Sequence, residues 1–268
     1  MIENSFSILD GIGEKGEKRL WSRGICTWQD FIKQQSIPFL SDNHKGHIDG
    51  KLERFTRSLR DGNQEDFNKS IKRKEHWRLF ERFREEVVCL DIETNGLPCK
   101  AGGYVTMVGL YDGYDYNCLI RGNNLNRETL LRALKPFKML ITFYGSVFDI
   151  PFLTNNFSLE LDMLHFDVCL EGKRVGLKGG LKKIESLLGI LRDDDVVGMD
   201  GFAAVRLWQM YKRGYGESLS TLIKYNKEDT VNLLTISEKV YQQLKSSTGI
   251  YDYIAQSTTN GQNSTSAG

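Results

Sequence analysis

The chain has 268 residues, 40% of them hydrophobic and 26% charged, and its formal net charge is +1. This length provides for one good-sized hydrophobic core and a smaller module, and the balanced charge excludes attraction to nucleic acid through overall charge. The five cysteines are scattered and nowhere spaced as Cys-x-x-Cys, so neither a disulfide framework nor a zinc site is expected. No apolar run approaches the roughly 20 residues of a membrane-spanning helix, and the N-terminus lacks the apolar core of a signal peptide. We therefore expect a cytoplasmic protein that does not contact membranes.

Residues 1–80 are polar and charged and are predicted to form a small helical module. Within it, Gly11-Ile12-Gly13 predicts a tight hairpin between two short helices, with backbone N–H groups that can face an anion. This pattern resembles the helix-hairpin-helix element, which grips nucleic-acid backbones without reading bases, so Gly11 and Gly13 are candidate nucleic-acid contacts. A tight turn with a purely structural role explains the same residues equally well.

A buried strand is predicted where four apolar residues, Val87 to Leu90, are bounded by charged residues. Asp91 and Glu93 follow, two residues apart, so both carboxylates project from one face of the strand. Burying two like charges together is costly unless a cation or hydrogen-bond donors compensate. A metal-binding pair and a strand that ends in an Asx turn both explain this stretch.

The elements that follow define the predicted fold class. Strands are predicted at residues 104–111, 114–120 and 139–144, with a helix at 126–134. The order strand, strand, strand, helix, strand, followed by helices, predicts an α/β domain with a mixed sheet flanked by helices, over residues 84–245.

Further polar residues stand at the ends of predicted elements. Asp149 follows a strand and opens an apolar helix, a place where an N-cap residue is also expected. A helix is predicted at residues 179–190, and Lys178, Lys182 and Lys183 give it a basic start that suits phosphate contacts.

The last helix is predicted from about Leu219 to Leu244, and Asp229 lies within its apolar stripe. A purely structural helix would carry Leu at that position, so the carboxylate indicates either a bound cation or a break that it caps. Residues 246–268 are rich in Ser, Thr, Asn and Gly and are expected to form a disordered tail.

Four acids with apolar neighbours thus stand at element ends: Asp91, Glu93, Asp149 and Asp229. Carboxylate oxygens suit Mg²⁺ or Mn²⁺, and phosphoryl chemistry uses a pair of such ions to activate water and stabilise the leaving oxygen. In order, residues 90–96, Phe148-Asp149 and Tyr225-x-x-x-Asp229 resemble the three motifs of the DEDD superfamily of 3′–5′ exonucleases, which have a ribonuclease-H-like fold.

The motifs also indicate a subclass and a group within this superfamily. Lys224 stands where the histidine subclass carries its histidine, so the third motif resembles the tyrosine (DEDDy) subclass. Residues 180–185, Asp200-Gly201 and the stretch from Tyr225 to Thr230 are similar to the YprB-like ribonuclease-H-like exonuclease group. Tyr144-Gly145 departs from that group, which often carries Asn there, and this puts a substrate contact in doubt.

The resemblance implies a two-metal 3′–5′ exonuclease that acts on single-stranded or 3′-terminal DNA or RNA. Asp91, Glu93 and Asp229 would hold the ion that binds the nucleophilic water, and Asp91 and Asp149 would hold the second. Tyr225, one helical turn before Asp229, would orient that water. Two other functions stay open: an inactive nucleic-acid-binding protein on the same fold, and a ribonuclease-H-like endonuclease.

Overall fold

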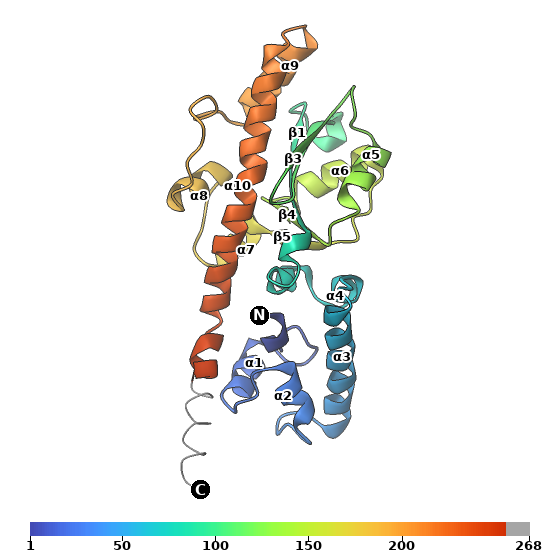
Figure 1. Cartoon of the computed structure of the whole chain (residues 1–268), viewed down its shortest axis with the longest axis vertical. Coiled ribbons are helices and arrows are strands. Elements are labelled where there is room, and N and C mark those ends of the chain that lie inside the picture. The colour runs from blue at the N-terminus through green and yellow to red at the C-terminus, as the bar shows by residue number, and fades with distance from the viewer. Residues whose placement is uncertain (256–268) are drawn as a thin grey trace. The chain divides into compact units, whose positions relative to one another are not determined.

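The computed structural model describes residues 1–255 and divides the chain into two compact units. The helical unit comprises Met1–Arg82 and the chain from Tyr241 onward, and the sheet unit comprises Phe83–Val240. Helix α10 (Glu217–Ser247) begins in the sheet unit and ends in the helical unit (Figure 1). In residues 1–255, no helix has both the length and the apolar character needed to cross a membrane.

The helical unit is built on buried aromatic side chains. Its elements are η1 (Ile2–Asn4), α1 (Glu14–Trp21), α2 (Trp28–Lys33), α3 (Asp42–Arg60), α4 (Glu65–Ser70) and η2 (Arg73–Leu79). Thr27 is the N-cap of α2 and forms a capping box with Asp30. The Thr27 side chain accepts from the Asp30 N–H, and the Asp30 side chain accepts from the Thr27 N–H. Trp28, Phe55 and Phe67 pack in series, with ring centroids 5.8 and 4.8 Å apart.

The glycine hairpin of this unit differs from the prediction on one side. Gly13 is the N-cap of α1, but residues 5–12 before it form turns and bends and contain no helix. Gly11 has φ +78°, and a Cβ there would lie 2.6 Å from the His44 ring, so only glycine fits.

The expected tail also differs from the structure. Helix α10 continues to Ser247, and residues 250–255 are helical. Ile250 is buried, and the Tyr253 ring lies 5.8 Å from that of Trp21 in the same unit. The disorder expected from residue 246 is therefore wrong for 246–255, because a few apolar anchors outweigh the polar average composition. Residues 256–268 of the predicted tail lie outside the described residues.

The sheet unit contains the mixed sheet that the sequence predicts. Its strands are β1 (Val87–Thr94), β2 (Val105–Tyr111), β3 (Tyr116–Ile120), β4 (Met139–Thr142) and β5 (Leu164–Asp167). They lie in the order β3-β2-β1-β4-β5, with β1 antiparallel to β2 and parallel to β4. Strand β1 is therefore central, as its apolar run predicts.

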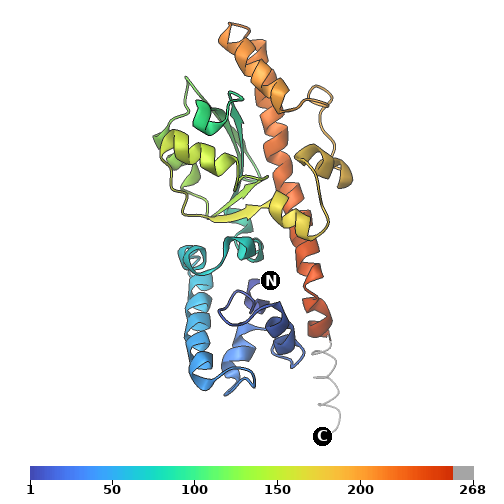
Figure 2. The same ribbon diagram turned by 180° about the vertical axis from the view of Figure 1, so that it is seen from behind.

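Helices cover both faces of this sheet. The helices of the sheet unit are η3 (Arg84–Glu86), η4 (Cys99–Ala101), α5 (Arg127–Leu134), α6 (Asp149–Phe157), α7 (Val168–Arg174), α8 (Leu181–Leu187), α9 (Gly201–Lys212) and the first part of α10. Figures 1 and 2 show α5 and α6 on one side of the sheet and α10 on the other. Helix α8 is shorter than the predicted 179–190, and Gly189 with φ +70° follows its end.

The alternation of β1 decides which of its side chains face each helix layer. Val88, Leu90 and Ile92 pack in a core with residues of α5 and α6. Asp91 and Glu93 have the opposite parity, so they face α10. The second core, between the sheet and helices α9 and α10, includes Tyr225. The α/β architecture thus brings the acids of the first predicted motif toward the helix that carries the third.

Candidate metal centre

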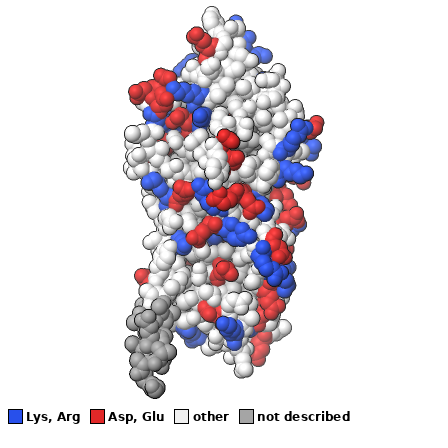
Figure 3. Space-filling view, in the orientation of Figure 1, with Lys and Arg blue, Asp and Glu red and all other residues white. Residues whose placement is uncertain are grey.

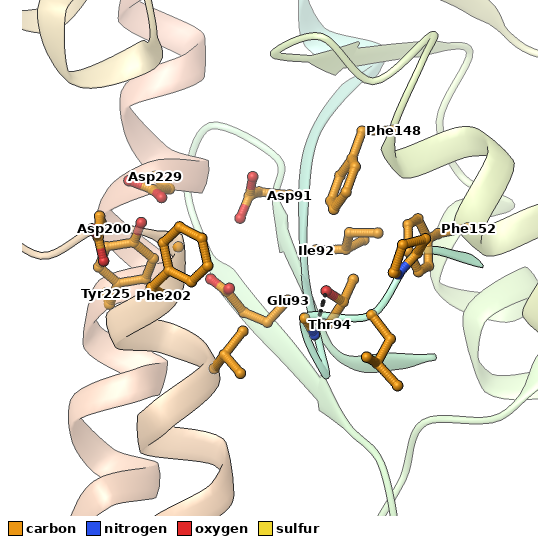
Figure 4. A pocket seen from close by; sticks show the side chains of 15 residues that line it. Asp91, Ile92, Glu93, Thr94, Phe148, Phe152, Asp200, Phe202, Tyr225 and Asp229 are labelled. Atoms are coloured by element: carbon orange, nitrogen blue, oxygen red, sulfur yellow. Dashed lines mark hydrogen bonds between the residues drawn. The ribbon is translucent and has the colours of Figure 1, made fainter. Parts of the chain in front are cut away.

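Three of the four predicted acids meet in one cluster. Asp91 and Glu93 on β1 and Asp229 on α10 each offer a carboxylate oxygen, and these oxygens all lie within 4.8 Å of one another. Figure 4 shows the two β1 side chains pointing toward Asp229 and Tyr225. The cluster therefore joins the end of the central strand to the middle of the long helix.

Local sequence explains why α10 presents an acid here. Leu222, Tyr225, Leu233 and Ile236 on the same helix are buried, and Asp229 is 7% exposed. The stripe packs on the sheet, and its i, i+4 spacing places Tyr225 and Asp229 on one face. The unbroken course of α10 shows that Asp229 does not cap a break in the helix.

Asp149 lies beside the cluster but is turned toward the strand. Its Oδ1 accepts a hydrogen bond of 3.2 Å from the backbone N–H of Ile92, between the two β1 acids. Phe148 occupies the N-cap of α6 and makes no side-chain cap, so the N-cap role considered for Asp149 is not what the structure shows. Asp149 is 3% exposed, and its charge adds to the larger effect of burial in raising the pKa of both Asp91 and Glu93.

The loop that delivers Asp149 is held by a second acid, Asp167 at the end of β5. Asp167 accepts from the N–H groups of Tyr144 at 2.9 Å and Ser146 at 3.0 Å. Tyr144 has φ +64°, a strained conformation for a residue with a side chain. Gly145 is required beside it, because a Cβ there would lie 2.2 Å from Thr142 Oγ1. Asp167 is thus a structural residue of the site.

The negative charges of the four acids are only partly offset by neighbouring groups. Burial, followed by the charges of Asp229 and Glu93, raises the pKa of Asp91 well above its ordinary value. Burial and the Asp229 charge raise the pKa of Glu93 to about 8, and burial raises that of Asp149 to about 7. Burial also raises the pKa of Asp229, although Arg192 opposes this effect. The site therefore favours protons or another cation in place of free carboxylates.

Tyr225 and Lys182 form a pair next to Asp229. The Lys182 ammonium donates a 3.1 Å hydrogen bond to the Tyr225 hydroxyl and lies 4.6 Å from the centre of its ring. Burial, then the Asp229 charge, raises the pKa of Tyr225, and burial lowers that of Lys182. Of the three lysines suggested for phosphate contacts, Lys182 faces the site, whereas Lys178 and Lys183 are exposed.

The sequence reasoning missed a salt-bridge network behind Asp229. Arg192, in the loop after α8, donates from Nη2 to Asp229. It also makes two hydrogen bonds to Glu185, of 2.6 and 2.7 Å, and Asn232 donates to the same Glu185 at 2.9 Å. Glu185 lies within a stretch quoted for its family resemblance, so a role was detectable there. Nothing in the local sequence marks Arg192, which precedes three aspartates.

Asn226 is a second residue whose role the sequence reasoning missed, although it lies in the stretch from Tyr225 to Thr230 that resembles the YprB-like group. It lies on α10 next to Tyr225 and donates to Asp91 at 2.8 Å and to Glu93 at 3.3 Å. A polar residue on the buried side of an otherwise apolar helix was the signal that could have found it.

An open cleft of about 650 Å³ lies against the acids. Its walls are largely apolar and aromatic, and Figure 4 shows Phe148 and Phe152 on the strand side and Phe202 on the helix side. Phe202 is 77% exposed and Phe148 42% exposed, so both rings present free faces. The cleft can therefore hold a flat, partly apolar group next to a cluster of carboxylates.

The donor set fits a hard divalent cation. Carboxylate oxygens are the ligands that Mg²⁺ and Mn²⁺ prefer, and three of them converge from two rigid elements. Burial, and then the charges of neighbouring acids, raise the pKa values of Asp91 and Glu93, and a bound dication would offset both effects. Gly11 and Gly13 lie in the helical unit and are not part of this centre.

The five-stranded mixed sheet, covered by helices and carrying an acidic centre, defines an RNase H-like nuclease fold. The family model described as the RNase_H superfamily matches residues 88–241, more than half of the chain. The chain therefore belongs to the RNase_H superfamily. A solved structure described as "apo form of the nuclease" is similar, with 18% identity and a TM-score of 0.48, over 66% of this chain and 82% of that one. No curated protein matches the sequence.

Proposed function

We propose that the protein is a metal-dependent 3′–5′ exonuclease of the DEDDy type, closest to the YprB-like group. The observation that carries the proposal is the convergence of Asp91, Glu93 and Asp229, with Tyr225 one turn before Asp229 on the same helix face. Ribonuclease-H-like nucleases use divalent cations at such acidic centres. Tyr225 is the feature that favours the exonuclease subclass over a ribonuclease H.

Each side chain has a separate role in this proposal. Asp91, Glu93 and Asp229 would hold one ion, and Asp91 and Asp149 would hold the second. Bound Mg²⁺ or Mn²⁺ would supply Lewis-acid stabilisation and lower the pKa of a bound water. The Tyr225 hydroxyl, kept protonated by its raised pKa, would orient the attacking water as a neutral hydrogen-bond donor.

The cleft supports a single-stranded 3′ end as the substrate. Exposed aromatic rings such as Phe148 and Phe202 stack on unpaired bases, and this stacking tolerates different sequences. Lys182, and the exposed Lys178 and Lys183, would contact the phosphate backbone. On the face shown in Figure 3, basic and acidic side chains are interspersed, so such contacts would be local.

The helical unit would add affinity for the nucleic-acid backbone through Gly11 and Gly13. The basis is the Gly-Ile-Gly turn at the N-cap of α1, which leaves N–H groups at a helix start. This unit contributes none of the three clustered acids. We also propose a cytoplasmic location, which rests on the sequence expectation alone.

One observation favours a second candidate function, an inactive nucleic-acid-binding protein. Arg192 is bound to Asp229, and a guanidinium that stays there would compete with a metal ion for that carboxylate. A third possibility, an endonuclease on the same fold, has no observation of its own beyond the shared acids.

A degradation experiment separates the three functions. Single- and double-stranded DNA and RNA, labelled at the 5′ end or internally, are incubated with Mg²⁺ or Mn²⁺. The proposed enzyme shortens 5′-labelled single strands one nucleotide at a time from the 3′ end. Fragments cut at internal positions would indicate an endonuclease. Binding without degradation under every metal condition would overturn the proposal in favour of the inactive protein.

A further inference from the structure

Asn226 occupies an unusual place for a carboxamide. It lies between the sheet and α10 and is fully buried, with 0% exposure. Its Nδ2 is 2.8 Å from Asp91 Oδ2 and 3.3 Å from Glu93 Oε1, so one amide group bridges both acids of β1. A buried amide held only for packing would not need two acidic partners.

The orientation of this amide is fixed from its other end. Asn226 Oδ1 accepts a 2.8 Å hydrogen bond from the Tyr116 hydroxyl of β3. Burial raises the pKa of Tyr116, so that hydroxyl remains a donor. Because the Tyr116 hydroxyl donates to Oδ1, the Nδ2 group faces Asp91 and Glu93. This is the orientation that the two carboxylates require when they are ionised to hold a cation, since ionised carboxylates only accept hydrogen bonds.

The sheet leaves room for Asn226 at a single glycine. Gly109 of β2 is paired with Asp91 in the antiparallel ladder, on the face toward α10. A Cβ on Gly109 would lie 2.0 Å from Asn226 Oδ1 and 2.5 Å from Thr230 Oγ1. The Asn226 side chain of α10 thus occupies space that Gly109 of β2 leaves open and bonds to Tyr116 of β3.

We propose that Asn226 is a positioning residue that orients Asp91 and Glu93 for a divalent cation, with Tyr116 setting the direction of its amide. The inference rests on the metal centre of the proposed function and adds the group that prepares it. A neutral donor reduces the repulsion between two carboxylates without bringing a charge that competes with the metal. Arg192, at Asp229, is the contrasting case, since it is itself a cation.

The test is a calorimetric titration of the metal-free 268-residue chain with Mn²⁺, without nucleic acid. Asn226→Leu keeps the approximate shape of the side chain and removes the donor. We expect Mn²⁺ affinity to fall about 10- to 100-fold, as for other residues that orient metal ligands. Tyr116→Phe keeps its ring and removes only the orienting hydroxyl, so we expect a loss of about two- to tenfold.

A matched control separates orientation from stability. Asn156→Leu removes a structural amide whose oxygen accepts from Val105 N–H at 3.0 Å and from Arg121 at 3.2 Å. We expect this variant to have a lower Tm and wild-type Mn²⁺ affinity. If Asn226→Leu does not fold, Tyr116→Phe decides the question.

The outcomes distinguish this inference from the function on which it rests. Weaker Mn²⁺ binding in Asn226→Leu or Tyr116→Phe, with unchanged binding in Asn156→Leu, supports it. Wild-type affinity in Asn226→Leu, or in Tyr116→Phe when that variant decides, overturns the inference and leaves the metal centre intact. Absence of Mn²⁺ binding by the wild-type chain overturns the proposed metal centre, and the inference with it.

Discussion

Each unit of the protein buries a cluster of charged side chains, and the two clusters are compensated differently. In the helical unit, Arg78 is 3% exposed and reaches Glu75 at 2.8 Å and Glu17 at 3.4 Å. Glu17 also accepts from the backbone N–H groups of Phe6, at 2.6 Å, and Ser7, at 2.9 Å. Arg78, Glu75 and Glu17 form the charged cluster of the helical unit.

In the described part of the sheet unit, a salt bridge reaches only one of the three clustered acids. Asp91 and Glu93 receive hydrogen bonds from the neutral Asn226, and Arg192 reaches only the third clustered acid, Asp229. Burial and mutual repulsion raise the pKa of the β1 acids accordingly.

The comparison shows that burial of an acid does not by itself indicate a functional site. A buried acid that is paired with a cation and with backbone donors has a structural role, because removing one partner leaves an uncompensated buried charge. A group of buried acids of which two are held by a neutral amide, not by a salt bridge, fits a site where a cation arrives from outside. Substitutions in the two clusters test this difference.

Removing one acid from each cluster should have opposite consequences. Asp91→Asn is expected to lower nuclease turnover about a thousandfold or more, because it removes a ligand of both proposed ions. Its Tm in EDTA should equal or exceed that of the wild type, since repulsion is relieved. Glu17→Gln should cost about 3 kcal/mol of unfolding free energy and leave turnover per folded molecule unchanged. Turnover that persists in excess EDTA, or in Asp91→Asn, would contradict the prediction.

Two tyrosines of α10 offer a similar contrast. Tyr225→Phe should reduce the single-turnover rate about ten- to a thousandfold at saturating metal, with metal and substrate affinity little changed, since only the water-orienting hydroxyl is lost. Tyr241→Phe removes the 2.6 Å hydrogen bond to Glu81 in the helical unit and should lower only Tm. A wild-type rate in Tyr225→Phe would exclude its hydroxyl from the mechanism.

The two arginines should also differ in what they do. Arg192→Gln removes a positive charge from Asp229, so we expect Mn²⁺ to bind about tenfold more tightly, while the metal-free protein becomes less stable. Arg78→Gln should destabilise the chain without changing Mn²⁺ affinity. Titration calorimetry with thermal unfolding in EDTA measures both effects. Weaker Mn²⁺ binding in Arg192→Gln would show that Arg192 holds Asp229 for the metal and does not compete with it.

A pH dependence of Mn²⁺ affinity is also expected, and it arises at the metal centre. The pKa of Glu93 is raised from its ordinary 4.5 to about 8, so the folded, metal-free state binds more protons than the unfolded state between these values. Its contribution to metal-free stability therefore falls as pH rises through this window. Mn²⁺ must displace the proton, so affinity should rise up to about tenfold per pH unit below 8 and level off above.

Glu93→Gln is the variant that isolates this contribution. It should bind Mn²⁺ more weakly and show a shallower rise of affinity with pH, because its side chain has no proton to release. Its Tm in EDTA should also fall less steeply with pH than that of the wild type. Identical pH slopes for the two proteins would show that Glu93 carries no proton at neutral pH.

The sequence by itself determined the parts of the site that depend on local periodicity. A strand repeats every two residues, so Asp91 and Glu93 had to share a face, and helical spacing placed Tyr225 and Asp229 together in the same way. The order of apolar runs and turns predicted the mixed sheet, and the structure confirms it. These features follow from backbone geometry, which acts over a few residues.

The tertiary structure decided which distant residues meet. Asn226 reaches Asp91 because α10 packs across β1 and because Gly109 leaves space there. The attachment of Arg192 to Asp229 depends on the path of a loop that no local pattern specifies. The orientation of Asp149 toward Ile92 likewise depends on how α6 sits against the sheet. Such contacts result from the packing of whole elements, where shape and burial act between segments far apart in the chain.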